Sequence, residues 1–288
     1  MTIPITTHTL DAPGATIAYD VRGTLGEGVP LLLIGSPMDA VGFTTLAGHF
    51  TDRPVVTYDP RGTARSKRTD GGGEITPGHH AGDLHRVVAA IGEPVDVFAS
   101  SGGAVNALAW VAEHGEQVRV LVAHEPPLVR LLPDGDVYVT AIEDMYQTYQ
   151  RVGMGPAMAK FILLVSYDGL LTDDYEYPPV DPAQFGLPTE DDGSRDDALL
   201  GQNLRGCTGF LPNLDALRST RTRIVMARGE GSGQTMAARA AGAVAEAIGA
   251  ELVAFPGDHA GFLGGEYGMK GEPDAFGQRL REVLDRVR

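Results

Sequence analysis

Short, mainly apolar runs recur through the first 123 residues, and stretches with helical spacing separate them. The runs fall at residues 30–34, 54–58, 95–99 and 118–123, and the helical stretches at 43–50, 81–91 and 104–113. Apolar runs without alternation are typical of strands buried on both faces of a parallel sheet. Ahead of them, residues 7–23 alternate around Pro13-Gly14, which predicts a hairpin. The pattern therefore predicts an α/β fold with a mostly parallel central sheet flanked by helices.

The pattern changes between Pro126 and about Asn213. Residues 141–149 and 156–165 have helical spacing, and residues 172–195, rich in Pro, Asp, Gly and Tyr, predict a loop. Sheet-like runs return at 223–227 and 251–255, with helices predicted at 234–248 and 274–288. We therefore predict a core domain formed by residues 1–126 and 214–288, and an inserted, mainly helical cap at residues 127–213.

Composition narrows the partners that we expect. The 288 residues carry a formal net charge of −15, which argues against nucleic acid or an anionic membrane as a partner. The lone cysteine, Cys207, excludes an intramolecular disulfide and suits a reducing compartment. Residues 1–10 lack the features of a secretory signal, and no apolar stretch approaches the roughly 18–20 residues of a membrane span. We expect a cytoplasmic protein, and a homo-oligomer is compatible with this composition.

The segment Ala99-Ser100-Ser101-Gly102-Gly103 joins one apolar run directly to a helical stretch. Small residues around a serine are typical of the sharp strand-to-helix turn called a nucleophile elbow, because bulkier neighbours would collide with its strained backbone. Such a turn presents the hydroxyl of Ser101 at a helix N-terminus, where negative charge is stabilised. The alternative is a Gly-rich turn that only packs closely.

A serine hydroxyl needs an adjacent base to become a nucleophile at neutral pH. His259 follows the last predicted strand, so in a parallel sheet it lies at the same carboxyl edge as Ser101. The base in turn needs a carboxylate, and there are two candidates, Glu125 and Glu230, each just past a predicted strand. We favour Glu125, because the two prolines after it restrict the local backbone.

The oxyanion of an acyl transfer needs two preorganised donors. We expect the N–H of Gly102 to be one. The other comes from the loop after residues 30–34, where Pro37 has no N–H, so the donor is Ser36 or, second in order, Met38. The charged segment Asp59-Pro60-Arg61-Gly62 we interpret as a salt-bridged loop that braces this region.

These motifs, in this order and spacing, resemble the α/β-hydrolase superfamily over nearly the whole chain. The carriers are the Ser101 elbow, Asp59-Pro60-Arg61-Gly62 with Ser66, Ile34-Gly35-Ser36-Pro37, and Gly257-Asp258-His259. Two positions depart from the superfamily pattern: Ile34 stands where a histidine is usual, and Ser232 where an acid is usual.

Within the superfamily, Ser100-Ser101-Gly102 together with His124-Glu125-x-Pro127 is similar to the fungal zearalenone lactonases. That resemblance implies a Ser–His–Glu triad of Ser101, His259 and Glu125, and hydrolysis of a lactone or ester. Haloalkane dehalogenases and epoxide hydrolases resemble the fold too, but they use an aspartate nucleophile, which Ser101 argues against.

We therefore expect a serine hydrolase that needs no cofactor or metal and cleaves an ester or lactone of an apolar small molecule. Two alternatives stay open: a carbon–carbon bond hydrolase or lyase on the same triad, and a non-catalytic binding protein on a hydrolase scaffold. Soft and aromatic side chains suit an apolar ligand, although the same residues would also serve as ordinary core of the cap. The residues expected at the pocket are Met38, Met145, Tyr149, Met154, Met158 and Phe161.

Overall fold

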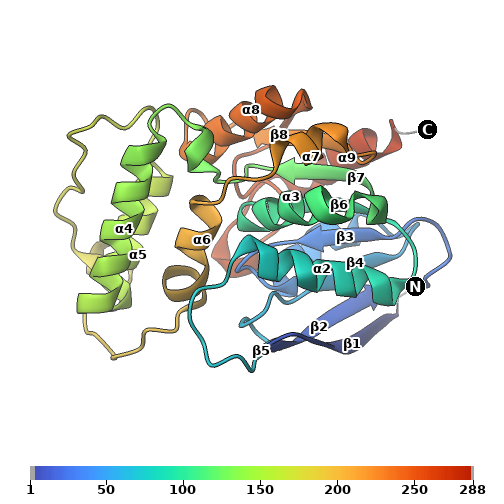
Figure 1. Ribbon diagram of the computed structural model, residues 1–288, viewed down its shortest axis with the longest axis horizontal. Helices are drawn as coiled ribbons and strands as arrows, with labels where there is room; N and C mark the ends of the chain where they lie inside the picture. The colour runs from blue at the N-terminus through green and yellow to red at the C-terminus, as the bar shows by residue number, and fades with distance from the viewer. Residues whose placement is uncertain (1–3, 287–288) are drawn as a thin grey trace.

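One mixed sheet organises the protein, which a computed structural model describes over residues 4–286. Within that range the sheet has nine strands in the order β1-β2-β4-β3-β6-β7-β8-β9, with β5 paired to β2 (Figure 1). β3, β4 and β6 to β9 pair in parallel, whereas β2 pairs antiparallel with β1, β4 and β5. The bounds are β1 (Ile5–Ala12), β2 (Ala15–Arg22), β3 (Leu31–Ile34), β4 (Val55–Tyr58), β5 (Lys67–Arg68), β6 (Val95–Ser100), β7 (Val118–His124), β8 (Arg223–Gly229) and β9 (Glu251–Phe255).

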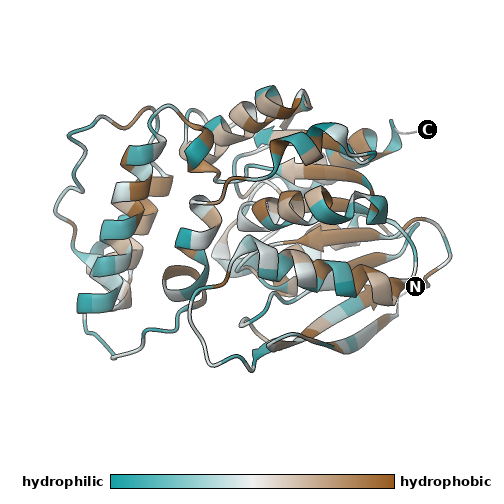
Figure 2. Ribbon diagram, in the orientation of Figure 1, coloured by the Kyte–Doolittle hydropathy of each residue, from teal (hydrophilic) through white to brown (hydrophobic). Residues whose placement is uncertain are grey.

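Helices cover both faces of the sheet and bury the apolar runs predicted from the sequence. One core cluster joins the sheet to α2 (Pro77–Ile91), α3 (Gly102–His114), α7 (Leu214–Ser219) and α8 (Met236–Ile248). The second joins the opposite face to η1 (Ala40–Phe43), α1 (Thr44–Gly48) and α9 (Pro273–Asp285). The central strands β3 and β7 are coloured hydrophobic along most of their length, whereas the β1–β2 edge is mixed (Figure 2). The predicted α/β fold and hairpin are confirmed.

The segment between β7 and β8 forms a separate group of helices at the end of the sheet where β7 finishes, on the left of Figure 1. It has its own core, built around Tyr138, Met145 and Tyr149. The helical elements before α7 are η3 (Val129–Leu131), α4 (Gly135–Val152), α5 (Met154–Val165), η4 (Pro182–Phe185), the π-helical η5 (Ala198–Asn203) and α6 (Leu204–Thr208). The cap boundaries 127 and 213 stay a prediction.

Two helical turns in this segment, η5 and α6, are absent from the sequence prediction. Residues 198–208 contain Gly201 and Gly206, so their intrinsic helix propensity is weak. The first turn, η5, is capped by the side chain of Asp197, which accepts hydrogen bonds from the N–H groups of Leu199 and Leu200, and α6 continues directly from it. Residues 1–3, at the start of the predicted core domain, and 287–288, at the end of the last predicted helix, lie outside the described residues.

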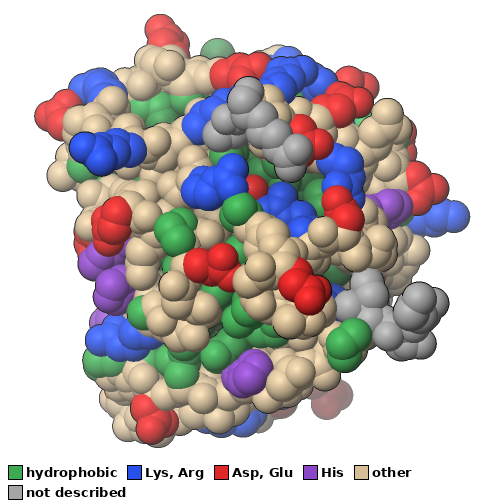
Figure 3. Space-filling model, turned by 90° about the vertical axis from the view of Figure 1, so that its right-hand side faces the viewer, with side chains coloured by type: hydrophobic (Ala, Val, Ile, Leu, Met, Phe, Trp, Pro, Cys, Tyr) green, Lys and Arg blue, Asp and Glu red, His purple; other side chains and the backbone are tan. Residues whose placement is uncertain are grey.

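The end of the molecule away from the insertion carries interspersed positive and negative side chains (Figure 3). None of the helices within residues 4–286 combines the length and the apolar character needed to cross a bilayer.

Candidate active site

Ser101 occupies a strained turn between β6 and α3. Its φ and ψ are 55° and −127°, a conformation that costs energy for any residue with a side chain. The turn is held to the neighbouring strand because the Ser101 N–H donates to the carbonyl of His124 at 2.9 Å. A Cβ on Gly102 would lie 2.5 Å from the Ser36 carbonyl oxygen, and one on Gly103 would lie 2.5 Å from that of Ile34. The small residues of the motif are therefore required by close packing against the loop after β3.

His259 meets Glu125 at the carboxyl edge of the sheet. The imidazole Nδ1 lies 2.6 Å from Glu125 Oε2. The second carboxylate oxygen accepts the Gly229 N–H at 2.8 Å, so both oxygens of this fully buried side chain are occupied. The imidazole is about half exposed, with 47% of its side-chain surface accessible. Glu230, the alternative partner for the histidine, is exposed, and its side chain is not bonded to His259 within the described residues.

The carboxyl of Glu125 is held ionised. Burial raises its pKa, but the hydrogen bond from His259 and the charge of the neighbouring imidazoles outweigh burial and lower the pKa to about 2. At neutral pH Glu125 is therefore an acceptor that fixes the proton of His259 on Nδ1 and leaves Nε2 free to accept.

His124, one residue before Glu125, is a buried imidazole packed among Phe98, Phe255 and Phe276. Its Nδ1 lies 3.3 Å from the Ser100 hydroxyl, and burial lowers its pKa to about 4. It is therefore neutral at pH 7. Its ring centroid is 6.0 Å from that of His259, so it supports the floor of the site.

Ser101 and His259 line one cavity of about 470 Å³, together with Ser36, Pro37 and Gly102. Within the described residues no hydrogen bond joins the Ser101 hydroxyl directly to the imidazole; contacts of this kind are often long in ligand-free enzymes and shorten when substrate binds. The first turn of α3 leaves backbone N–H groups without helical partners at this wall. The candidate nucleophile, the candidate base and the candidate oxyanion donors thus line one cavity.

The structure places the expected pocket residues in two groups. Phe161 lines the cavity, whereas Met145 and Tyr149 are fully buried in the core of the insertion. Met154 and Met158 pack against that same core, and none of these four methionine and tyrosine side chains lines the cavity. Met38 folds back over Gly35 and Gly42 beneath the loop and also lies off the cavity.

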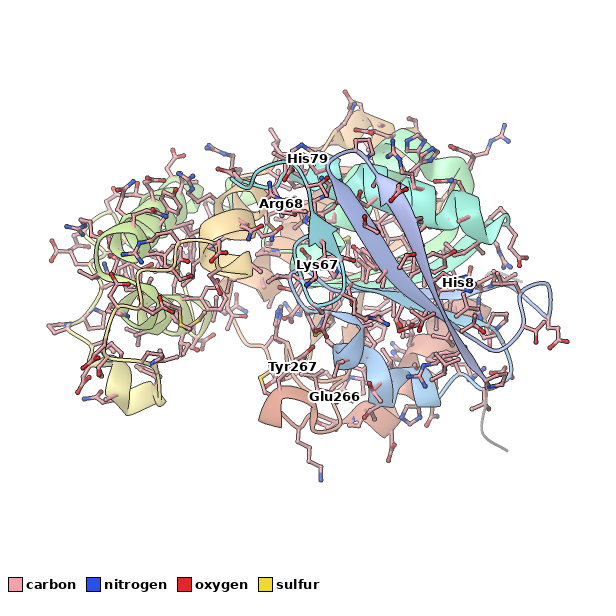
Figure 4. The ribbon with its side chains drawn as sticks, turned by 90° about the horizontal axis from the view of Figure 1, so that it is seen from below. His8, Lys67, Arg68, His79, Glu266 and Tyr267 are labelled. Atoms are coloured by element: carbon pink, nitrogen blue, oxygen red, sulfur yellow. The ribbon has the colours of Figure 1, made fainter. Side chains whose placement is uncertain are left out.

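Sequence reasoning missed most of the apolar cavity wall. It comes from η5, α6 and the start of α8, at Leu199, Leu204, Cys207 and Met236. The mouth is bordered by Met269, in the loop after His259. That loop is attached to the segment after β3 because the Tyr267 hydroxyl donates to Asp39 at 2.6 Å and the Thr45 N–H donates to Glu266 at 2.8 Å (Figure 4).

The charged loop after β4 has the bracing arrangement expected for it. Arg61 makes a buried two-point ion pair with Asp83 of α2, at 2.6 and 2.7 Å. Asp59 accepts from the N–H of Ala40 at 3.1 Å and from the Arg65 side chain at 2.6 Å. These contacts fix the segment after the candidate oxyanion loop to the rest of the core.

A larger cavity of about 730 Å³ opens elsewhere, on the insertion between α4, α5 and residues 173–180. It contains none of the predicted site residues, so its size carries no catalytic meaning. Within residues 4–286 there is no group of three or more His, Cys, Asp or Glu side chains placed to hold a metal ion.

Comparisons with known proteins agree with this architecture. No family model matches the chain. A solved thermophilic esterase from Thermogutta terrifontis superposes with a TM-score of 0.68 at 18% identity, covering 97% of both chains. The enol-lactonase from Burkholderia xenovorans LB400 superposes with a TM-score of 0.59 at 14% identity, covering 96% of this chain and all of that one. The uncharacterized hydrolase YraK of Bacillus subtilis (strain 168) is 31% identical over 290 residues, covering 98% of this chain and 97% of the relative. The chain belongs to the α/β-hydrolase superfamily.

Proposed function

We propose that this hydrolase cleaves a carboxylic ester or lactone of an apolar small molecule through a Ser101–His259–Glu125 triad and an acyl-enzyme. The observation that carries the proposal is the 2.6 Å contact between His259 and the buried, ionised Glu125, made beside the cavity that Ser101 lines. The motif resemblance to zearalenone lactonases supports the choice of a glutamate as the acid.

In this mechanism, Ser101 Oγ attacks the carbonyl carbon while its proton passes to Nε2 of His259. Glu125 stabilises the imidazolium through Nδ1–H, and the N–H groups of Gly102 and Ser36 bind the oxyanion. The tetrahedral intermediate collapses, and the leaving alkoxide takes the proton from Nε2. Water then attacks the acyl-enzyme while Nε2 takes its proton, which forms a second tetrahedral intermediate. As this intermediate collapses, the bond from the acyl carbon to Ser101 Oγ breaks, Oγ takes the proton back from Nε2, and the acid is released. In a lactone, acid and alcohol leave as one hydroxy acid.

The kind of substrate is supported by the cavity and by the structural neighbours. A volume of about 470 Å³ lies within the usual range for small-molecule sites. Its wall includes Phe161, Leu199, Leu204 and Met236, so the groups flanking the reacting carbonyl are apolar. An esterase and an enol-lactonase share the fold, which is compatible with either substrate class.

The test is a panel of 4-nitrophenyl esters and of five- and six-membered lactones, assayed with the wild type and the Ser101→Ala variant. Removing the nucleophile should lower kcat/KM by at least about 10³-fold without changing the unfolding midpoint in urea. Wild-type-like hydrolysis by the variant would contradict the mechanism. Cleavage of a 1,3-diketone, with no turnover of any ester or lactone, would indicate that the triad catalyses carbon–carbon bond hydrolysis instead.

A further inference from the structure

Two polar side chains on the insertion side of the cavity, Asn203 and Thr208, are already hydrogen-bonded within the protein. The amide oxygen of Asn203 accepts from His80 Nε2 at 2.7 Å, and its nitrogen donates to the Ala198 carbonyl at 2.6 Å. The hydroxyl of Thr208 donates to the Leu204 carbonyl at 2.7 Å. A ligand group reaching this part of the wall therefore meets apolar side chains and two polar groups that are already hydrogen-bonded, and the uncharged hydroxyl of Ser232 is the buried lining group without a partner among the described residues.

Charge in the cavity is negative at its exposed side. Among the described residues that line it, the carboxylate of Asp258 and the imidazole of His259 are the ionisable groups other than the thiol of Cys207, and neither Lys nor Arg is present. Asp258 belongs to the turn after β9 and is exposed, and its Oδ1 accepts the Ala260 N–H at 2.8 Å. Its negative charge is therefore fixed in position immediately beside the base.

A substrate carboxylate would be poorly accommodated in such a space. The free-energy cost of desolvation is far larger for a carboxylate than for a methyl group, unless a cation or several free hydrogen-bond donors replace the bound water. The described lining residues supply no Lys or Arg to pair with it, Asn203 and Thr208 are engaged within the protein, and the carboxylate of Asp258 adds repulsion at the exposed side of the cavity. An uncharged chain of the same length meets neither penalty.

We propose that the cavity is selective by charge: it takes esters or lactones with uncharged acyl and alcohol parts and rejects those bearing a carboxylate, with Asp258 as a specificity-determining residue. This inference rests on the proposed function. It adds the class of substrate that the site excludes and a residue that contributes to the exclusion.

The experiment compares 4-nitrophenyl pentanoate with mono-4-nitrophenyl glutarate, which differ by a carboxylate in place of the terminal methyl group and share one leaving group. The glutarate monoamide ester separates charge from polarity. We expect kcat/KM for the glutarate to be at least about 100-fold below that for the pentanoate, after correction for their hydroxide rates, with the monoamide between them.

The Asp258→Asn variant keeps an oxygen for the Ala260 N–H and removes only the charge. This variant should lower the ratio of kcat/KM for the pentanoate to kcat/KM for the glutarate by about two- to fivefold at low salt, and by less at high salt. The matched control is Asp192→Asn: Asp192 also accepts an N–H two residues on, from Ser194, but lies on the exposed loop of the insertion and off the cavity. Because both esters are measured on each variant, a general change in turnover cancels.

Two results would overturn the inference. If the wild type hydrolyses both esters within fivefold in a Ser101-dependent manner, the site does not select by charge. If Asp258→Asn and Asp192→Asn change the ratio equally or not at all, Asp258 has no part in selectivity. Absence of any Ser101-dependent hydrolysis of all three esters and of the lactones would instead contradict the proposed function itself.

Discussion

Replacing Glu125 by glutamine separates the role of its charge from that of its shape. The buried carboxylate is bonded on one side to the Gly229 N–H and on the other to Nδ1 of His259. Because the Gly229 N–H can only donate, the glutamine oxygen must stay on that side. The amide NH₂ then faces Nδ1 and forces the imidazole proton onto Nε2, the nitrogen that accepts the proton of Ser101 in the proposed mechanism.

Placing the imidazole proton on the wrong nitrogen determines how large a loss of kcat we expect. An acid-to-amide change of the same kind in a triad costs about 10⁴-fold in turnover, equivalent to about 5.5 kcal/mol of transition-state stabilisation. We expect a loss of that order in kcat for Glu125→Gln on the best substrate of the ester panel. KM should change little, because Glu125 is buried behind His259 and does not line the cavity.

Glu230→Gln is the matched control, since Glu230 follows the neighbouring strand and is exposed. It should retain kcat within about twofold. Steady-state kinetics at pH 7.5 on both variants, with far-UV circular dichroism to verify folding, provides the comparison. A loss below tenfold for Glu125→Gln, or an equal loss in both variants, would refute the assignment of Glu125 as the partner of His259.

Two further predictions concern stability. Burial lowers the pKa of His80 and of His124 to about 4, so between pH 6.5 and 4 the unfolded chain binds protons that the native protein does not. The free energy of unfolding should therefore fall as pH is lowered from 6.5, by about 3 kcal/mol for each histidine at pH 4. Urea unfolding at several pH values measures this. A free energy of unfolding that does not change between pH 7 and 5 would contradict the prediction. Gly103→Ala should lower the free energy of unfolding by about 2 kcal/mol or more, because the new Cβ would lie 2.5 Å from the Ile34 carbonyl oxygen. A thermal unfolding midpoint equal to that of the wild type would show that the turn at Ser101 is not tightly packed.

The sheet could be predicted from the sequence because its strands are buried on both faces. β3, β4, β6 and β7 consist of almost uninterrupted apolar residues, a pattern that few other structures produce. The same local logic fails for η5, where an Asp197 cap and packing against the core, rather than propensity, hold the turns together. Tertiary contacts that have no short-range signature decide such segments.

The position of Ser101 and His259 at one sheet edge follows from parallel topology, since both come after strands that end there. Which residues of the insertion line the cavity could not be predicted in the same way. Met145 and Tyr149 carry the same apolar signal as Phe161, yet they face the core of the insertion. Hydrophobicity shows that a side chain is buried, and only the packing of α4 against α5 and η5 determines which space it fills.

The central claim is that Ser101 is made nucleophilic by His259. The most direct test is to treat the wild type and the His259→Ala variant with a fluorophosphonate and to map the adduct by peptide mass spectrometry. We expect stoichiometric phosphonylation of Ser101 in the wild type and a reaction slowed by at least about 10³-fold in the variant. An unmodified Ser101 in the wild type, or equal labelling rates in both proteins, would contradict it.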